Sequence, residues 1–502
     1  MNALPVKVYL TAAVKAVESA YAANHGGDCY ALMERAGAAL VRIAETVKSD
    51  TSEIWIFCGR GNNGGDGYVA GSLLLERGAR IRLFAVGKPH EESEAARACR
   101  NFLSRGGKIE TMLPSLEEGR PGIIIDALLG TGISSEPHFP VSDWISFINK
   151  VRAKVIAVDC PSGMNADTGA VLGNCVNADY TVCMLALKPG LFTSDAVDYT
   201  GKIVYDALGC DLDDYKDELA AFEKIPLTRS SYEDIIPQLP QRFKSCNKGD
   251  NGRVLIIAGS RGMGGAAILA GCGALRAGAG LVKIATDPFN VPAINSVHPE
   301  LMTVDFNDDE AVKAALQWCD TVAVGPGLSK SRRARELLDL VFDSGVDCIA
   351  DADALSLMSV QEPLPQENRI ITPHPGEAGR LLGCDAESVN ADRFMAASKL
   401  QQRYGGVVLL KGAGSIVCDR HRMTVIDSGS PALAVGGSGD MLTGIIAALA
   451  AGGLSLRQAA LIGACIHGKA GEMAEEEYGS AGTLPSDLED YVRRLVNGRV
   501  HN

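Results

Sequence analysis

The sequence predicts an α/β protein built from two three-layer domains, and two observations support this fold class. Short β-rich runs alternate with segments of helical length, first over residues 53–205 and again over residues 253–426. Strands that alternate with helices favour parallel sheets covered by helices on both faces. An acidic and then proline-punctuated stretch, residues 211–240, interrupts the alternation and indicates a linker or docking segment. We therefore expect domains at residues 1–224 and 225–502.

The first domain is expected to contain six strands, each short and rich in β-branched or aromatic residues. They are residues 53–58, 80–86, 122–127, 154–159, 180–184 and 202–205. Helices are expected at 68–77 and 93–104, and the apolar run 8–14 predicts an amphipathic helix because Lys15 and Glu18 interrupt it. Residues 59–67, between a strand and a helix, are expected to form a loop.

The second domain repeats the alternation with a different set of loops. Its expected strands are residues 253–258, 281–286, 321–324, 348–350, 369–372 and 407–411, with a hairpin at 415–418 and 423–426. Apolar helices are expected at 266–276 and 441–451. The uncharged stretch 441–456 is shorter than the roughly 18 to 20 residues that span a bilayer, so we expect a buried core helix and no membrane partner.

Composition excludes several classes of function. Lys and Arg number 48 against 61 Asp and Glu, a net charge of −13 that argues against nucleic acid as a partner. The 14 cysteines include no CxxC pair, which disfavours a zinc site or a disulfide framework. Reduced thiols and the absence of a secretory signal lead us to expect a cytoplasmic protein.

A glycine-rich segment, GRGNNGGDG at 59–67, follows the first strand. Its glycines satisfy the pattern GxGxxG, but the next strand ends in Ala85-Val86-Gly87-Lys88 without the acid that binds ribose hydroxyls in NAD dehydrogenases. A dehydrogenase is therefore disfavoured. The segment still suits phosphates or an alkali cation at the start of a helix.

Two further strands of this domain end in aspartate, Asp126 before LLGTG and Asp159 before CPSG. Carboxyl ends of parallel strands form the ligand crevice of an open sheet. An isolated aspartate at a strand end more often caps its loop. Because the two aspartates and the NNGGDG segment converge on one edge, we favour a functional site.

Four segments in order, LMERAG at 32–37, NNGGDG at 62–67, DALLGTG at 126–132 and DCPSGMNADTG at 159–169, resemble the Rossmann-like epimerase domain that acts on hydrated nicotinamide nucleotides. The resemblance implies a potassium ion held by Asn63, Asp126 and Ser162, and Asp159 as the carboxylate that moves the proton at the reacting carbon. The substrate contacts that it implies are Asn62, Asn63, Gly64, Gly65, Asp66, Gly130, Thr131, Gly132, Ile133, Ser134, Ser135, Glu136 and Asp159.

The segment AVGGSGDMLT, residues 434–443, is the most specific one in the second domain. Consecutive small residues let backbone N–H groups converge on an anion at a helix start, and Asp440 beside them can take a proton from a hydroxyl. These features indicate phosphoryl transfer without a P-loop. The alternative is a buried glycine-rich helix junction. Residues 463–470, GACIHGKA, lack the final Ser or Thr of a P-loop and lie within a helical stretch, so we reject that motif.

Two more loops of the second domain follow strands. Residues 411–415, KGAGS, are a plausible backbone cradle for a nucleotide phosphate or ribose. A lone histidine is more often structural, but His374 beside Glu377 at a strand end could serve substrate, or magnesium through water.

From Lys248 to about Tyr491 the chain resembles the ribokinase-like fold and, within it, the nucleotide-dependent dehydratase of hydrated NAD(P)H. His374 stands where other kinases of the fold carry Asn, which favours the dehydratase, and Ser329 replaces a frequent Gly in VGPGLS. The resemblance implies Asp440 as the catalytic base. It implies substrate contacts from Ala266, Gly327, His374 and Asp440, and adenine-nucleotide contacts from Lys411, Gly412, Ala413, Gly414, Ser415 and Gly439.

Together the two resemblances imply one bifunctional repair enzyme. The first domain would interconvert the R and S epimers of NADHX and NADPHX, and the second would dehydrate the S epimer to NAD(P)H with ADP or ATP and Mg²⁺. ADP is the expectation for a fused arrangement, and we expect a homo-oligomer. The rivals are a kinase of a small hydroxymethyl heterocycle and a first domain that is only a binding scaffold.

Overall fold

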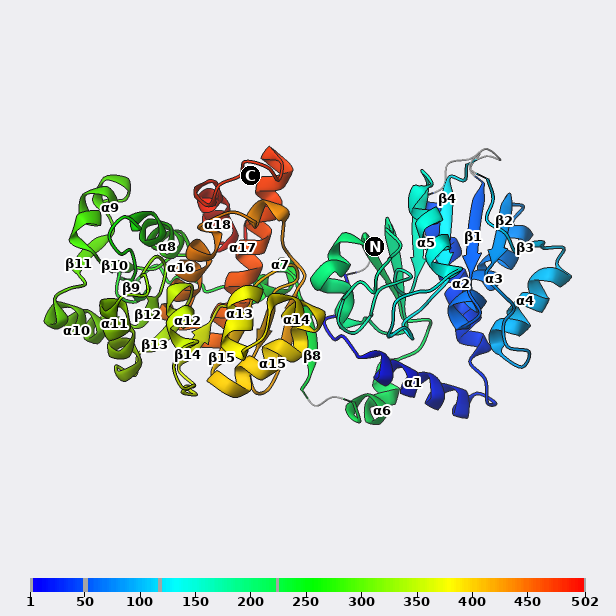
Figure 1. Cartoon of the computed structure of the whole chain (residues 1–502), viewed down its shortest axis with the longest axis horizontal. Coiled ribbons are helices and arrows are strands. Elements are labelled where there is room, and N and C mark those ends of the chain that lie inside the picture. The colour runs from blue at the N-terminus through cyan, green and yellow to red at the C-terminus, as the bar shows by residue number, and fades with distance from the viewer. Residues whose placement is uncertain (1–2, 48–52, 116–119, 223–224, 501–502) are drawn as a thin grey trace. The chain divides into compact units, whose positions relative to one another are not determined.

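The computed structural model of the chain describes residues 3–47, 53–115, 120–222 and 225–500 (Figure 1). Contacts divide the chain into two compact units, Met1–Leu227 and Thr228–Asn502. The boundary that we predict after residue 224 falls at residues 223–224, which lie outside the described part of the chain. Each unit is an α/β domain with helices on both faces of a sheet, so the predicted fold class is confirmed.

The first unit contains a seven-stranded sheet in the order β3-β2-β1-β4-β5-β6-β7, parallel throughout. All six predicted strands are present. The short β3 was not predicted, because two residues carry no readable pattern. The strands are β1 Ile54–Cys58, β2 Ile81–Ala85, β3 Ile109–Glu110, β4 Ile123–Ala127, β5 Lys154–Val158, β6 Tyr180–Met184 and β7 Lys202–Asp206.

Both faces of this sheet are buried, as its continuous apolar strands require. In β1, Ile54, Ile56 and Cys58 pack with α1 to α4 on one face, whereas Trp55 and Phe57 pack with α5 on the other. The helices are α1 Thr11–Asn24, α2 Tyr30–Val47, α3 Asn62–Glu76, α4 Glu94–Ser104, α5 Val141–Lys150 and α6 Lys216–Ala220, with 3₁₀ turns at Pro189–Phe192, Ser194–Asp198 and Leu212–Tyr215.

The second unit contains a ten-stranded sheet in the order β11-β10-β9-β12-β13-β14-β15-β16-β17-β8. Pairing is parallel from β11 to β15, and the predicted hairpin β16–β17 is antiparallel. The strands are β8 Leu227–Ser230, β9 Arg253–Ile257, β10 Leu281–Thr286, β11 Met302–Asp305, β12 Thr321–Val324, β13 Asp347–Ala350, β14 Arg369–Ile371, β15 Val407–Leu410, β16 Ile416–Cys418 and β17 Met423–Ile426.

Two strands at the edges of this sheet, β8 and β11, were not predicted. The interpretation of residues 211–240 as a linker or docking segment is wrong in part, because β8 and α7 within it belong to the second unit. Edge strands are paired on one side only, so they need little apolar alternation, and the sequence signal is correspondingly weak.

Helices α7, α8, α16, α17 and α18 cover one face of the second sheet, and α10, α11 and α15 contact the other (Figure 1). Helix α16 is buried along most of its length, as predicted, and no described helix is long and apolar enough to cross a membrane. All 14 cysteines are free. The helices are α7 Tyr232–Ile235, α8 Gly264–Arg276, α9 Val291–Val297, α10 Asp309–Trp318, α11 Arg332–Asp343, α12 Asp353–Met358, α13 Pro375–Leu382, α14 Ala386–Ala391, α15 Arg393–Tyr404, α16 Ser438–Ala451, α17 Leu456–Tyr478 and α18 Glu489–Leu495.

Candidate active sites

The glycine-rich segment after β1 is mostly helix and not the predicted loop. Helix α3 begins at Asn62 directly after Gly61, whose extended backbone provides no side-chain cap. The first N–H groups of α3 therefore have no side-chain acceptor, and such groups attract anions. The glycines permit close packing, since a Cβ at Gly59 would overlap the carbonyl oxygen of Leu128, and one at Gly64 would overlap that of Gly59.

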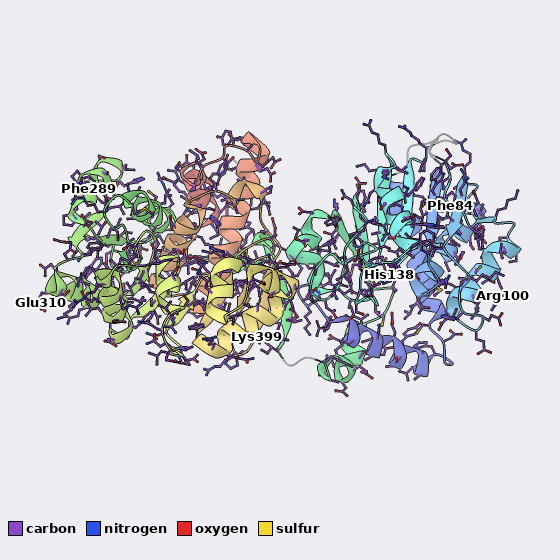
Figure 2. All side chains as sticks on the ribbon, in the orientation of Figure 1. Phe84, Arg100, His138, Phe289, Glu310 and Lys399 are labelled. Carbon is purple, nitrogen blue, oxygen red and sulfur yellow. The ribbon has the colours of Figure 1, made fainter. Side chains whose placement is uncertain are left out.

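A cavity of about 770 Å³ opens at the carboxyl edge of the first sheet. Seven of the predicted substrate residues line it, namely Asn62, Asn63, Asp66, Gly130, Thr131, Gly132 and Asp159. Six do not line it, namely Gly64, Gly65, Ile133, Ser134, Ser135 and Glu136. The chain after Gly132 turns away and returns to the wall with His138, labelled in Figure 2, and with Phe139, Pro140 and Val141.

Asp159 lies at the end of β5 with a left-handed backbone angle, φ +64°, which is unfavourable for a residue with a side chain. Its Oδ1 accepts hydrogen bonds from the Met184 amide, at 3.1 Å, and from the Lys188 ammonium. Lys188 is 1% exposed and also donates to the Met184 carbonyl at 2.9 Å. A buried ammonium must be paired, and Asp159 at the cavity wall is the partner of Lys188.

Lys188 lines the cavity beside Asp159, and the sequence did not indicate it as a site residue. Burial acts to lower its pKa, but the charges of Asp159 and the nearby thiols together raise the pKa above its usual value. Two acids line the same cavity, Asp66 on α3 and Glu18 on α1. Burial raises the pKa of both, and the Asp159 charge adds to the effect. The cavity therefore contains one paired carboxylate beside acids that favour the protonated form.

The three predicted potassium ligands lie together around Leu129. Asn63 Nδ2 donates to the Leu129 carbonyl at 2.9 Å, and the Leu129 amide donates to Ser162 Oγ at 2.8 Å. Ser162 in turn donates from Oγ and from its amide to the Asp126 carboxylate, at 2.7 and 2.9 Å. Asp126 is fully buried, and burial raises its pKa to about 6 against the opposing hydrogen bonds from Ser162 and Leu128.

In the second unit, helix α16 directs its N-terminus toward the carboxyl edge of the sheet. Gly437 precedes it with φ +91°, and Asp440 lies in its first turn. Close packing of α16 on α8 depends on glycine, because a Cβ at Gly444 would overlap the Ala270 carbonyl and one at Gly273 would overlap the Met441 carbonyl. The buried glycine-rich helix junction, given above as the alternative, is therefore present. It also places Asp440 at the positive end of the α16 dipole.

Asp440 has a strongly shifted titration. Burial raises its pKa to about 7; the nearby charge of Asp351 adds to this, Lys411 opposes it, and Asp353 and Glu377 raise it further. A group that titrates near neutrality can exchange protons efficiently under physiological conditions. The environment of Asp440 therefore fits general-base chemistry better than simple helix capping.

Lys411, at the end of β15, forms a buried ion pair that the sequence also did not reveal. Its Nζ lies 2.7 Å from Oδ1 of Asp351, which is 1% exposed and follows β13. Asp351 Oδ2 accepts from Thr443 Oγ1 of α16 at 2.8 Å. A Cβ at Gly439 would lie 3.2 Å from Lys411 Nζ. Lys411, Asp351 and the start of α16 thus form one hydrogen-bonded assembly.

The loop that follows Lys411 is shaped by glycine and anchored by a buried arginine. Gly412 and Gly414 have φ values of +139° and +60°, and Arg393 donates to the carbonyls of Leu410 and Lys411, each at 3.2 Å. Ser415 Oγ donates to the Gly412 carbonyl at 3.1 Å. The loop is therefore a fixed cradle, with Ala413 between two glycines whose positive φ values a residue with a side chain would rarely adopt.

The three remaining predicted substrate contacts differ in their surroundings. A Cβ at Gly327, where φ is +55°, would lie 3.1 Å from the Ala266 Cβ, so these two residues are neighbours. His374 caps α13, where its Nδ1 accepts from the Gly376 amide at 3.0 Å, and its Nε2 lies 3.5 Å from Glu377 Oε1. His374 therefore has a structural function in addition to any contact that Nε2 makes.

Two clusters outside the predictions also contain reactive side chains. His467, within the rejected P-loop-like motif, lies 3.2 Å from Ser438 Oγ at the start of α16, and burial lowers its pKa to about 4.

In the second cluster, ligand atoms of Cys272, His298 and Glu489 lie within 4.8 Å of one another. Arg276 donates to Glu489 at 2.8 Å, so this second cluster links α8 to α18 through an ion pair.

Comparison with known proteins identifies both units. The family model of the YjeF-related protein N-terminus matches residues 29–190, and that of NAD(P)H-hydrate dehydratase matches residues 254–494. Among solved structures, a ribokinase-like superfamily protein from Enterococcus faecalis is 26% identical with a TM-score of 0.50; the match covers 54% of this chain and 96% of that one.

Similarity to curated relatives extends over nearly the whole chain. The bifunctional NAD(P)H-hydrate repair enzyme of Escherichia coli strain K12 is 40% identical over 478 residues, which cover 95% of this chain and 91% of that protein. The Vibrio cholerae enzyme of the same name is 39% identical over 497 residues, 98% and 99% of the two chains. These matches confirm the predicted combination of an epimerase with a dehydratase, and the chain belongs to the family of bifunctional NAD(P)H-hydrate repair enzymes.

Proposed function

We propose that each crevice carries one of the two repair reactions, with Asp159 acting in epimerisation and Asp440 in dehydration. The observation that supports this division is the charge around each aspartate. Asp159 is paired with the buried ammonium of Lys188, whereas Asp440 lies among other carboxylates and has a pKa near 7. Two acids in such different surroundings suit two different proton transfers.

In the first crevice, inversion at C6 of the hydrated ring requires one group that accepts a proton and one that supplies it. Asp159 is the acceptor in this proposal, because its carboxylate lines the cavity and is held in place by the Lys188 ammonium. Asp66 lines the same cavity and has a raised pKa, so it is the candidate donor. The uncapped start of α3 would receive the pyrophosphate of the substrate.

A potassium ion fits the residues around Asp126. The hydrogen bonds to its carboxylate, within the described residues, come from Ser162 and the Leu128 amide, and no basic side chain donates to it. A fully buried carboxylate without a cationic partner is costly, and a hard monovalent ion would neutralise it. Asn63, Asp126 and Ser162 are the candidate ligands, and the ion would fix the loop at Leu129 that borders the cavity.

In the second crevice, Asp440 would take the proton of the C6 hydroxyl as that oxygen attacks the terminal phosphorus of ADP or ATP. The nucleotide leaves with one phosphate fewer, and the ring nitrogen lone pair expels phosphate from C6. Loss of a proton from C5 then restores the C5–C6 double bond of NAD(P)H. Phosphate is a far better leaving group than hydroxide, which explains why a nucleotide is consumed.

The nucleotide would lie on the Lys411–Ser415 cradle and the start of α16 at Gly439, and the hydrated substrate near Ala266, Gly327 and His374. The carboxylates near Asp440 supply the oxygen ligands that Mg²⁺ prefers, and Asp353 and Glu377 are the candidates to hold it. When bound, Mg²⁺ would neutralise charge on the nucleotide phosphates.

The direct test is incubation of the purified chain with a mixture of both epimers and either ADP or ATP, followed at the reduced-nicotinamide absorbance. Full recovery is the expected result, with ADP as the preferred nucleotide. Recovery of only the S share would indicate that the first unit is a scaffold. A phosphorylated heterocycle without any recovery would indicate the kinase alternative.

A further inference from the structure

The end of β2 lacks the acidic residue that many dinucleotide-binding sheets carry at this position. In such folds the pyrophosphate lies at the helix after the first strand, and the ribose of the adenosine half lies at the end of the neighbouring strand. The order β3-β2-β1-β4-β5 is that of such a sheet. Because Asp159 follows β5, the reacting ring falls on the β4–β5 side of α3, and the adenosine half falls on the β2 side.

Sheets that select an unphosphorylated ribose place Asp or Glu at the end of the second strand. The six residues here, Ala-Val-Gly-Lys-Pro-His at 85–90, include no acid. The guanidinium of Arg60 lies against Gly87 instead, so closely that a Cβ there would overlap Arg60 Nε. Val86 and Arg60 both line the cavity, and Lys88 follows as an exposed cation.

Arg60 has no hydrogen-bond or ion-pair partner within the described part of the chain. Glu94 also lines the cavity, but its Oε1 accepts a hydrogen bond from the Cys29 amide at 3.2 Å, just before α2. A guanidinium that lines a cavity without a protein partner is available for an anionic ligand.

We propose that Arg60, Gly87 and Lys88 form a subsite for the 2′-phosphate of the adenosine ribose, so that the epimerase prefers NADPHX to NADHX. The planar guanidinium matches a phosphate monoester with two parallel N–H···O bonds. The lack of a side chain at Gly87 leaves room for the Arg60 guanidinium at the end of β2, and the neighbouring exposed Lys88 adds a second positive charge. The subsite rests on the proposal that epimerisation takes place in this cavity.

The decisive experiment measures epimerisation of NADHX and NADPHX separately, by chromatographic resolution of the two epimers. The intact chain is compared with Arg60→Ala and with Arg152→Ala, an exposed arginine of the same unit that does not line the cavity. We expect Arg60→Ala to lower kcat/KM for NADPHX by about 10- to 100-fold, the value of a hydrogen bond to a charged group, mainly through KM. Turnover of NADHX by Arg60→Ala should be unchanged. Arg152→Ala should epimerise both substrates as the intact chain does.

A second readout uses inhibitors that lack the reacting ring. Adenosine 2′,5′-bisphosphate should inhibit the intact chain more strongly than adenosine 5′-phosphate, and Arg60→Ala should remove that difference. Equal loss on both substrates, or no preference for NADPHX in the intact chain, would overturn the subsite. Failure of the intact chain to epimerise either substrate would instead reject the proposed function.

Discussion

The two crevices use the same edge of a parallel sheet but place their central acids in opposite electrostatic surroundings. Asp159 forms an ion pair with the buried lysine Lys188, whereas Asp440 lies among Asp351, Asp353 and Glu377 and has a pKa of about 7. In the second unit the lysine of the site, the partly buried Lys411, pairs with the buried Asp351 instead. Because Lys411 pairs with Asp351, Asp440 is left without a direct cationic partner among the described residues, and it can exchange a proton near neutral pH.

The largest effect is expected from Asp440→Asn. The amide keeps the size of the side chain but cannot accept a proton, so dehydration should fall by about 10³- to 10⁴-fold, near the upper end for a general base. Epimerisation should be unaffected. The measurement is the rate of each reaction on a purified epimer with ADP. Equal loss of both activities in a folded variant would contradict the division of labour.

Asp159→Asn should produce the reciprocal pattern. Epimerisation should slow by about 10²- to 10³-fold, with a smaller change in KM, because a proton acceptor is lost while a hydrogen-bonding oxygen remains. Spontaneous epimerisation is subtracted, and an excess of intact dehydratase reports the S epimer as it forms. Near-normal turnover would reassign Asp159 to substrate binding.

Lys188→Met tests the ion pair that distinguishes the first crevice. The variant leaves the Asp159 carboxylate, which is 18% exposed at the cavity wall, without its cation. Breaking a fully buried pair lowers the free energy of unfolding by about 3–5 kcal/mol, and we expect a smaller loss here because Asp159 is partly exposed. The double variant Lys188→Met/Asp159→Asn should recover much of this loss, because the amide at position 159 carries no charge. Denaturant unfolding of the intact chain, Lys188→Met, Asp159→Asn and the double variant gives the coupling free energy between the two side chains. A double variant no more stable than Lys188→Met would show that the pair is not the source of the effect.

The pH dependence of dehydration should follow Asp440. Its raised pKa means that the base is protonated, and inactive, below about pH 7. The rate should therefore rise about tenfold per pH unit up to that value and then level off. Epimerisation measured on the same samples serves as the control. A dehydration rate that is flat from pH 5 to 7, at saturating nucleotide, would exclude Asp440 as the base.

Asp126→Ala should give the smallest change, a weaker dependence of epimerisation on potassium. The variant removes the formal charge from the candidate ion site while Asn63 and Ser162 remain. The assay compares rates in potassium and in a large organic cation at constant ionic strength. An unaltered potassium response would place the ion elsewhere.

The sequence was sufficient for the fold class and for the strand-end aspartates, because parallel strands and their carboxyl ends carry local signals. It was insufficient for Lys188, which lies 29 residues after Asp159 and reaches it only because Leu185 turns the chain with φ +63°. Asp351 was missed for a similar reason. The segment DADAL, residues 351–355, contains both Asp351 and Asp353, and the sequence does not show which of them is paired. Only the folded chain shows that Lys411 pairs with Asp351.

Two features of the first crevice could not be read from the local sequence. Residues 62–66 begin α3 and do not form a loop, because Gly61 precedes the helix without a side-chain cap and the sequence therefore lacks a start signal. Residues 133–136 do not line the cavity that Gly130, Thr131 and Gly132 border. In both cases the path of the backbone depends on contacts between distant segments, such as that between Gly59 and Leu128.

The most direct test of the account is complementation between the two aspartate variants. Asp159→Asn alone, given mixed epimers and ADP, should recover the S share rapidly and the rest at the spontaneous rate, and Asp440→Asn alone should recover almost none. An equal mixture of the two proteins should restore all of the NAD(P)H at a rate comparable with the intact chain. A mixture that repairs no more than Asp159→Asn alone would contradict the claim that the two crevices are independent active sites joined by a diffusing substrate.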